Sequence, residues 1–118
     1  MQNLKNTEQI MNKLNQSEPQ NHLIDQSDIY WNFISAYRIL SEQFINRHKD
    51  YVDWKLISIY QHLSENFIRE HKDYVIWFNI TAYQTLSENF IIEFKDKVDW
   101  INISEFQTLS ENFIISNW

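Results

Sequence analysis

The chain has 118 residues, 43% of them hydrophobic, which is enough for one folded domain with a modest core and excludes a disordered chain. It contains no glycine and no cysteine, so glycine-rich phosphate loops, disulfides and thiolate metal sites are excluded. The net charge of −6 argues against a general phosphate-binding surface. Without glycine for tight hairpin turns, the composition favours helices over a β-fold.

The first segment, residues 1–27, is polar and lies outside the pattern that follows. Leu4, Met11 and Leu14 are spaced as on one face of a helix, which predicts a short amphipathic helix. Ser17 and Pro19 form a helix-start signal that predicts a second short helix. We expect residues 1–27 to form an N-terminal helical cap, and a disordered leader is the alternative.

The remaining segment, residues 28–118, contains four copies of one sequence pattern with a period of 23 residues. The copies are residues 31–53, 54–76, 77–99 and 100–118. A period of this length is typical of stacked units that cannot bury their own apolar faces alone. The sequence therefore predicts an all-α fold, a short α-solenoid of four helix-turn-helix repeats.

The repeat contains two helix-start signals: a serine signal that recurs in all four copies, and an aspartate signal that is present only before Trp54 and Trp100, because Tyr30 and Ile76 replace the aspartate in the other two copies. Asp53 precedes Trp54, and Ser64 precedes Glu65, so both polar side chains stand where they can cap a helix. These signals predict two helices per repeat, of about nine and about ten residues, joined by a tight turn. The alternative is one long helix per repeat, because the apolar residues also fall on one side of a continuous helix.

The repeated apolar columns are interpreted as the core between neighbouring repeats, and a ladder of ligand-binding aromatic rings is the alternative. The predicted core consists of Trp31, Trp54, Trp77, Trp100, Leu40, Leu63, Leu86, Leu109, Phe44, Phe67, Phe90 and Phe113, with two isoleucine columns. The column of Tyr37, Tyr60, Tyr83 and Phe106 is assigned to the same core. The small hydroxyl column of Ser35, Ser58, Thr81 and Ser104 is expected to allow close helix approach.

No set of residues with catalytic or metal-binding spacing can be assembled. The glutamate column that contains Glu42 is explained by its position at a helix start. His48 and His71 share a column with Phe94, which indicates a packing position rather than a metal ligand. We therefore expect no enzyme, no cofactor and no metal.

Partner binding is expected to depend on apolar residues that the core pattern does not require. The candidates are Phe78, Ile92, Ile101, Ile115 and Trp118. Exposed together, such residues would form a contact patch for a protein. The sequence thus favours a protein-binding helical repeat.

The alternative functions are nucleic-acid binding and a purely structural, self-associating role. Arg38, Gln61, Gln84 and Gln107 form a polar column that could face bases one repeat at a time. The net negative charge makes nucleic acid the less favoured partner.

The pattern Val-Asp-Trp-x-x-Ile-Ser-x-Tyr-Gln-x-Leu-Ser-Glu-x-Phe-Ile of residues 52–68 resembles short repeats of uncharacterised proteins from giant DNA viruses and phages. The resemblance covers residues 31–118. It implies a viral or mobile-element origin and, by analogy with other small viral proteins, a host or viral protein partner. Inhibition of a host defence nuclease, as by anti-CRISPR proteins, is the expectation that follows from the analogy.

The C-terminal end predicts an association. The fourth copy leaves Phe113, Ile114, Ile115 and Trp118 without a following repeat. We expect this end to form a two-fold homodimer or to dock on a partner. No apolar run reaches membrane-spanning length, so we expect a cytoplasmic protein of the host cell that does not enter the membrane.

Overall fold

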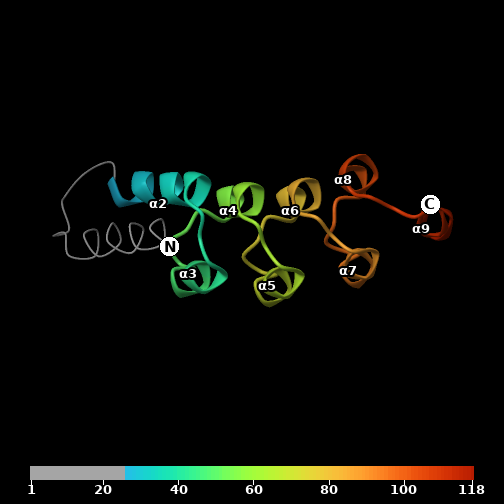
Figure 1. Ribbon diagram of the computed structural model, residues 1–118, viewed down its shortest axis with the longest axis horizontal. Helices are drawn as coiled ribbons and strands as arrows, with labels where there is room; N and C mark the ends of the chain where they lie inside the picture. The colour runs from blue at the N-terminus through green and yellow to red at the C-terminus, as the bar shows by residue number, and fades with distance from the viewer. Residues whose placement is uncertain (1–25) are drawn as a thin grey trace.

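The structure is a computed structural model that describes residues 26–118, and this range contains helices and no strand. The helices lie in two parallel rows (Figure 1). The first row contains α2 (Gln26–Tyr37), α4 (Trp54–Tyr60), α6 (Trp77–Tyr83) and α8 (Trp100–Phe106). The second row contains α3 (Glu42–Arg47), α5 (Glu65–Glu70), α7 (Glu88–Glu93) and α9 (Glu111–Asn117). We call these the first helices and the second helices of the repeats. The predicted all-α helical repeat is confirmed.

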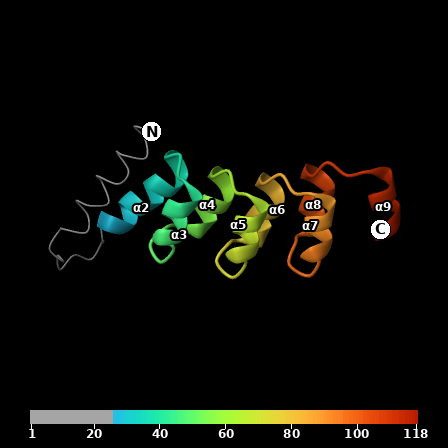
Figure 2. The same ribbon diagram turned by 60° about the horizontal axis from the view of Figure 1, so that its bottom comes forward.

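The repeats stack side by side along the long axis of the molecule. Each first helix contacts the next, α2 with α4, α4 with α6 and α6 with α8. The turned view shows the same succession of helix pairs (Figure 2). The principal axes measure 57 × 33 × 21 Å, so the described part is an elongated two-layered rod.

The predicted helix starts explain why each repeat folds as two helices rather than one. The Asp53 carboxylate accepts a hydrogen bond from the Leu56 backbone N–H, 2.9 Å away, at the start of α4. Ser64 Oγ accepts from the Phe67 N–H at 3.1 Å and caps α5 in the same way. Ile76 stands in the place of Asp53 before α6 and gives no side-chain cap.

Inside the repeats the helices are shorter than predicted, seven residues for α4 and six for α5. The first helix ends because Gln61 leaves it with φ −91° and ψ 145°. The second ends at His71, whose carbonyl accepts from the N–H groups of Tyr74 and Val75 and closes a turn. Turns therefore occupy residues that the sequence pattern had assigned to helices.

The core is a continuous cluster along the seam between the two rows. Its buried members include Trp31, Leu40, Leu63, Leu86, Phe44, Phe67, Phe90 and Phe113, together with isoleucines of both repeated columns. Trp54, Trp77, Trp100 and Leu109 are partly buried and pack against it. Each repeat thus adds its own apolar layer to one shared core.

At the N-terminal end, α2 begins at Gln26 and runs for 12 residues. The expected boundary between residues 27 and 28 therefore lies within a helix. The cap predicted for residues 1–27 lies almost entirely outside the described residues.

Candidate functional site

A buried glutamine hydrogen-bonds each repeat to the repeat before it. Residues used in these junctions are not available to bind a partner. Gln84 is 6% exposed and reaches back to the preceding repeat. Its Nε2 donates to the carbonyl oxygens of Ser58 and Gln61, at 3.0 and 2.7 Å, and its Oε1 accepts from the Leu63 N–H at 3.1 Å. Gln61 and Gln107 make the same three contacts with their own preceding repeats.

The hypothesis that the column of Arg38, Gln61, Gln84 and Gln107 faces bases is therefore wrong. Gln61 and Gln84 are buried, and their amides are fully used by the backbone of the neighbouring repeat. A buried side-chain amide that satisfies three backbone groups serves the fold, because those groups would otherwise lose their hydrogen bonds.

The glutamate column makes a second contact across each junction. The Glu42 carboxylate accepts from both the N–H and the Oγ of Ser64 in the next repeat, at 2.7 and 3.0 Å. Glu65 and Glu88 repeat this contact with Ser87 and Ser110. The same glutamates begin the second helices, so one residue type serves both the helix start and the next repeat.

The hydroxyl column was expected only to allow close helix approach, but its inner members also make hydrogen bonds across the junctions. Ser58 Oγ donates to the Trp54 carbonyl at 2.6 Å and accepts from the Ile76 N–H at 3.1 Å. Thr81 bridges its own helix and Asp99 in the same way. These hydroxyls are fully buried and fix where the next first helix begins.

One aromatic column on the first helices stays exposed in all four repeats. Its members, Tyr37, Tyr60, Tyr83 and Phe106, have exposed fractions of 72%, 59%, 60% and 58%. The prediction that this column belongs to the core is wrong. Tyr37 and Tyr60 lie near each other, with ring centroids 6.5 Å apart, and Phe33 lies 4.9 Å from Tyr37. We call Tyr37, Tyr60, Tyr83 and Phe106 the aromatic row.

The five predicted partner-binding residues are exposed but are spread over several surfaces. Their exposed fractions are 59% for Phe78, 41% for Ile92, 70% for Ile101, 76% for Ile115 and 57% for Trp118. Phe78 and Ile101 lie on the first helices, at about 140° around the helix from the aromatic row. Ile92 and Ile115 lie on the second helices. The Trp118 ring packs edge-on against the Trp100 ring, with ring centroids 5.4 Å apart.

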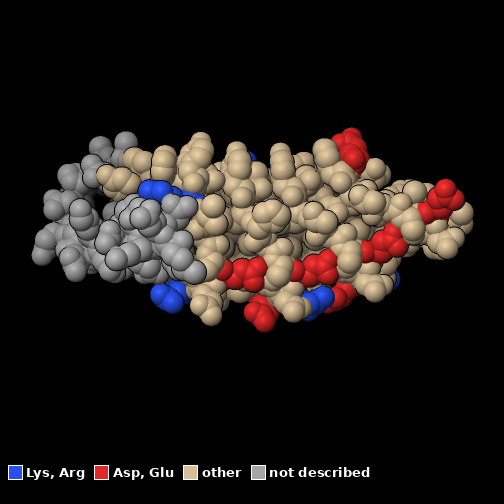
Figure 3. Space-filling model, viewed as in Figure 1, with Lys and Arg blue, Asp and Glu red and all other residues tan. Residues whose placement is uncertain are grey.

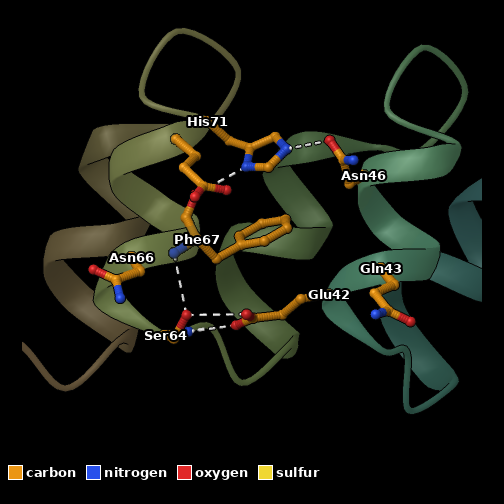
Figure 4. A pocket seen from close by; sticks show the side chains of 8 residues that line it. Glu42, Gln43, Asn46, Ser64, Asn66, Phe67 and His71 are labelled. Carbon is orange, nitrogen blue, oxygen red and sulfur yellow. Dashed lines mark hydrogen bonds between the residues drawn. The ribbon is translucent and has the colours of Figure 1, made fainter.

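A groove of about 260 Å³ lies between α3 and α5 (Figure 4). His71 is one of the residues that line it, with Nδ1 donating to the Phe67 carbonyl and Nε2 lying 2.8 Å from the Asn46 side-chain amide. The Phe67 ring stacks on the imidazole at 4.0 Å between centroids. His71 is thus buried and packed, as its shared column with Phe94 indicated.

The corresponding position between α5 and α7 is spanned by an ion pair instead. Arg69 donates to the Glu93 carboxylate through two nitrogens, at 2.7 and 2.8 Å. These hydrogen bonds lower the pKa of Glu93 below its ordinary value and raise that of Arg69. The second helices thus vary from junction to junction, whereas the aromatic row is repeated.

On the face shown in Figure 3, most of the acidic side chains lie over the second helices. Each second helix carries a glutamate in its first turn, and Figure 3 shows acidic side chains in a row over the second helices. The surface over α4 and α6 in the same view is mainly uncharged. Over residues 26–118, no three histidine, aspartate or glutamate side chains gather as metal ligands would. None of the helices in this range has both the length and the hydropathy to cross a membrane.

Comparison with protein-family models, with curated proteins and with solved structures gives no match to this chain.

Proposed function

We propose that the protein is a non-enzymatic, protein-binding helical repeat whose binding surface is the aromatic row. The observation that carries the proposal is the exposure of this column in all four repeats, at 58% or more. The two other columns that are aromatic in all four repeats, the tryptophan column and the phenylalanine column, are buried or partly buried. Because the fold does not bury these rings, their recurrence in each repeat favours a role on the surface.

Interface physics supports a protein partner. Tyrosine is enriched where interfaces gain most of their affinity, because it offers a large, rigid apolar ring with a polar tip. A row of such rings, with one per repeat, suits a partner that presents apolar side chains along an extended line. Phe33 lies beside Tyr37 and would lengthen the row at one end.

The kind of partner follows from the resemblance to viral and phage repeats. A protein of the infected host is the partner class that this resemblance favours. Inhibition of a host factor, such as a defence nuclease of the CRISPR type, is the form of activity that we propose for the complex.

The test replaces two central rings of the row. The Tyr60→Ser, Tyr83→Ser double variant is used beside wild type to capture partners from host lysate, and the captured partner is then purified and titrated. We expect the double variant to bind about tenfold more weakly or worse. Tyr51→Ser is the matched control, because Tyr51 is 64% exposed but lies outside the row. A partner held equally by both variants would refute the role of the aromatic row.

Nucleic acid is the second candidate, because exposed aromatic rings also stack on the bases of single strands. Such binders combine the rings with a positively charged groove, whereas this chain carries a net charge of −6. A titration with single-stranded DNA and RNA oligonucleotides distinguishes the two functions. Salt-sensitive binding that requires Tyr60 and Tyr83 would favour nucleic acid over protein.

A further inference from the structure

The ion pair between α5 and α7 shows how this repeat holds a guanidinium. Arg69 donates to both oxygens of the Glu93 carboxylate, at 2.7 and 2.8 Å. It also donates to the side-chain oxygen of Asn66 at 2.6 Å, and its guanidinium carbon lies 5.6 Å from the centroid of the Phe90 ring. One carboxylate, one amide oxygen and one aromatic ring therefore surround the cation at this junction.

The groove between α3 and α5 contains the same kinds of group without the arginine. The groups that surround Arg69 have counterparts one period of 23 residues earlier. These counterparts, which all line the groove, are Gln43, Phe67 and Glu70. Asn46 stands at the position of Arg69, and its shorter side chain lies 2.8 Å from His71 Nε2. The groove of about 260 Å³ thus lies where the next junction holds a guanidinium.

The acid of this groove is available to a ligand. Glu70 is exposed, and within residues 26–118 its carboxylate has no hydrogen-bond or ion-pair partner. Lys49, which follows α3, directs its ammonium to the Tyr74 ring instead, 5.8 Å from the ring centroid. Glu70 therefore differs from its counterpart Glu93, whose carboxylate is held by Arg69.

The stacking of the repeats does not require an acid at this position. At the junction of α7 and α9, Ile92 and Ser116 hold the positions of Arg69 and Glu93, and these two side chains cannot form an ion pair. The first helices α6 and α8 nevertheless stack as the others do. The role of Glu70 is therefore not explained by the fold.

We propose that the groove between α3 and α5 binds the guanidinium of an arginine side chain carried by a protein partner. The planar fork would donate two hydrogen bonds to Glu70 and a third to the Gln43 side-chain oxygen, beside the Phe67 ring. A lysine ammonium is a point charge and cannot match these groups in the same way. The groove lies on the second helices, so this binding goes beyond the proposed function and uses no residue of the aromatic row.

The charge around the groove favours an arginine within a polypeptide over the free amino acid. Glu42 and Glu70 both line the groove, and its eight described lining residues include no lysine or arginine. Free arginine would bring its own carboxylate near these glutamates, without a cation to receive it. In a polypeptide that group is an uncharged amide, and other basic residues beside the arginine would meet the acidic row over the second helices (Figure 3).

The test adds N-acetyl-arginine amide to the isotope-labelled full chain and follows the backbone amide shifts by NMR. We expect saturable shifts around the groove, with a dissociation constant on the order of millimolar, because the contacts are few and exposed. Glu70→Gln should weaken this binding about fivefold or more, and N-acetyl-lysine amide should bind about threefold or more weakly than the arginine probe. Glu105→Gln is the matched control, because Glu105 is equally an exposed glutamate but lies on α8, away from the groove. We expect this control to bind as wild type does.

Two exchanges between the junctions sharpen the test. Arg69→Asn leaves Glu93 without its cation, and we expect this variant to gain a second set of saturable shifts, around α5 and α7. Asn46→Arg makes the reverse change. Its guanidinium should occupy the groove and abolish binding of the probe there.

Three results would each overturn the inference. They are the absence of saturable shifts around the groove in wild type, equal binding by Glu70→Gln and Glu105→Gln, and tighter binding of free arginine than of N-acetyl-arginine amide. The last result would assign the groove to the free amino acid. The aromatic-row variants are judged by partner capture and not by this probe, so the proposed function can fail while this inference holds, or the reverse.

Discussion

The side-chain amide of Gln61 lies 2.6 Å from the backbone carbonyl of Arg38, its counterpart one repeat earlier. The same relationship links Gln84 with Gln61 and Gln107 with Gln84, at 2.7 Å each. A side chain that contacts the equivalent position of the preceding repeat fixes both the spacing and the rotation between repeats. The solenoid is therefore held by polar contacts as well as by its apolar layers.

Replacing Gln84 with alanine should strongly destabilise the protein. The change removes three hydrogen bonds and leaves the Leu63 N–H and two carbonyls inside the junction without their partner. We expect the free energy of unfolding to fall by about 2–4 kcal/mol, because unpaired buried groups bear their desolvation cost. Urea denaturation measures the loss.

Gln43→Ala is the control for this prediction, because Gln43 is exposed at the start of α3. It should change the free energy of unfolding by no more than about 0.5 kcal/mol. Equal stability of the Gln84→Ala and Gln43→Ala variants would show that the buried amide does not hold the junction.

Replacing Trp77 with alanine tests the contribution of the partly buried tryptophans. The Trp77 ring lies 5.0 Å from Phe94 and 6.2 Å from Phe90, and its Nε1 donates to the Lys72 carbonyl at 2.9 Å. We expect the free energy of unfolding to fall by about 3–5 kcal/mol, because the change leaves a cavity and removes these contacts. A melting temperature within a degree or two of wild type would contradict the assignment of this column to the core cluster.

The sequence predicted the helices better than it predicted which repeated residues are buried. A helix cap depends only on residues that are close in the sequence. The helix starts predicted at Asp53 and Ser64 are therefore found in the structure. The assignment of Tyr60 to the core is wrong because a residue that recurs in every repeat need not be buried. The stripe Trp54, Ile57, Ser58 and Gln61 follows the spacing i, i+3, i+4, i+7 of one helix face, and Tyr60 lies to one side of it. That spacing could have identified both the buried glutamine and the exposed tyrosine.

The hydrogen bonds between repeats could not be predicted from the sequence alone. Glu42 and Ser64 are 22 residues apart, and each already had a sufficient local role at a helix start. Their contact depends on the distance between neighbouring second helices, which periodicity does not give.

Adding a missing cap should stabilise the protein. Ile76 precedes α6 with φ −96° and ψ 103°, close to the −84° and 105° of Asp53, but it offers no side-chain acceptor. Ile76 is 41% exposed, so little burial is lost on replacement. We expect Ile76→Asp to raise the free energy of unfolding by about 0.5–1 kcal/mol, measured in urea.

The converse change is the control for the added cap. Asp53→Ala should lower the stability by about 1 kcal/mol, because it removes the hydrogen bond from the Leu56 N–H. If Ile76→Asp destabilised the protein while Asp53→Ala was neutral, capping would not explain the aspartates before the first helices.

The ion pair of Arg69 and Glu93 should make part of the stability depend on pH. Hydrogen bonds from the guanidinium are the main cause that lowers the pKa of Glu93, against a partial desolvation that raises it. A carboxyl whose pKa is lower in the folded state stabilises the fold above the ordinary glutamate pKa, about 4.3. This contribution is lost as the pH falls through the folded-state pKa of Glu93.

Glu93→Gln should therefore lose less stability than wild type on acidification from neutral pH to below the ordinary glutamate pKa. The effect will be small, because side chains at the surface are screened by solvent, and both partners are about 40% exposed. Urea midpoints at a series of pH values measure it. In an Arg69→Gln background the same substitution should flatten the pH profile much less, because the guanidinium that lowers the pKa is gone. An equal flattening in both backgrounds would assign the pH dependence to groups other than this pair.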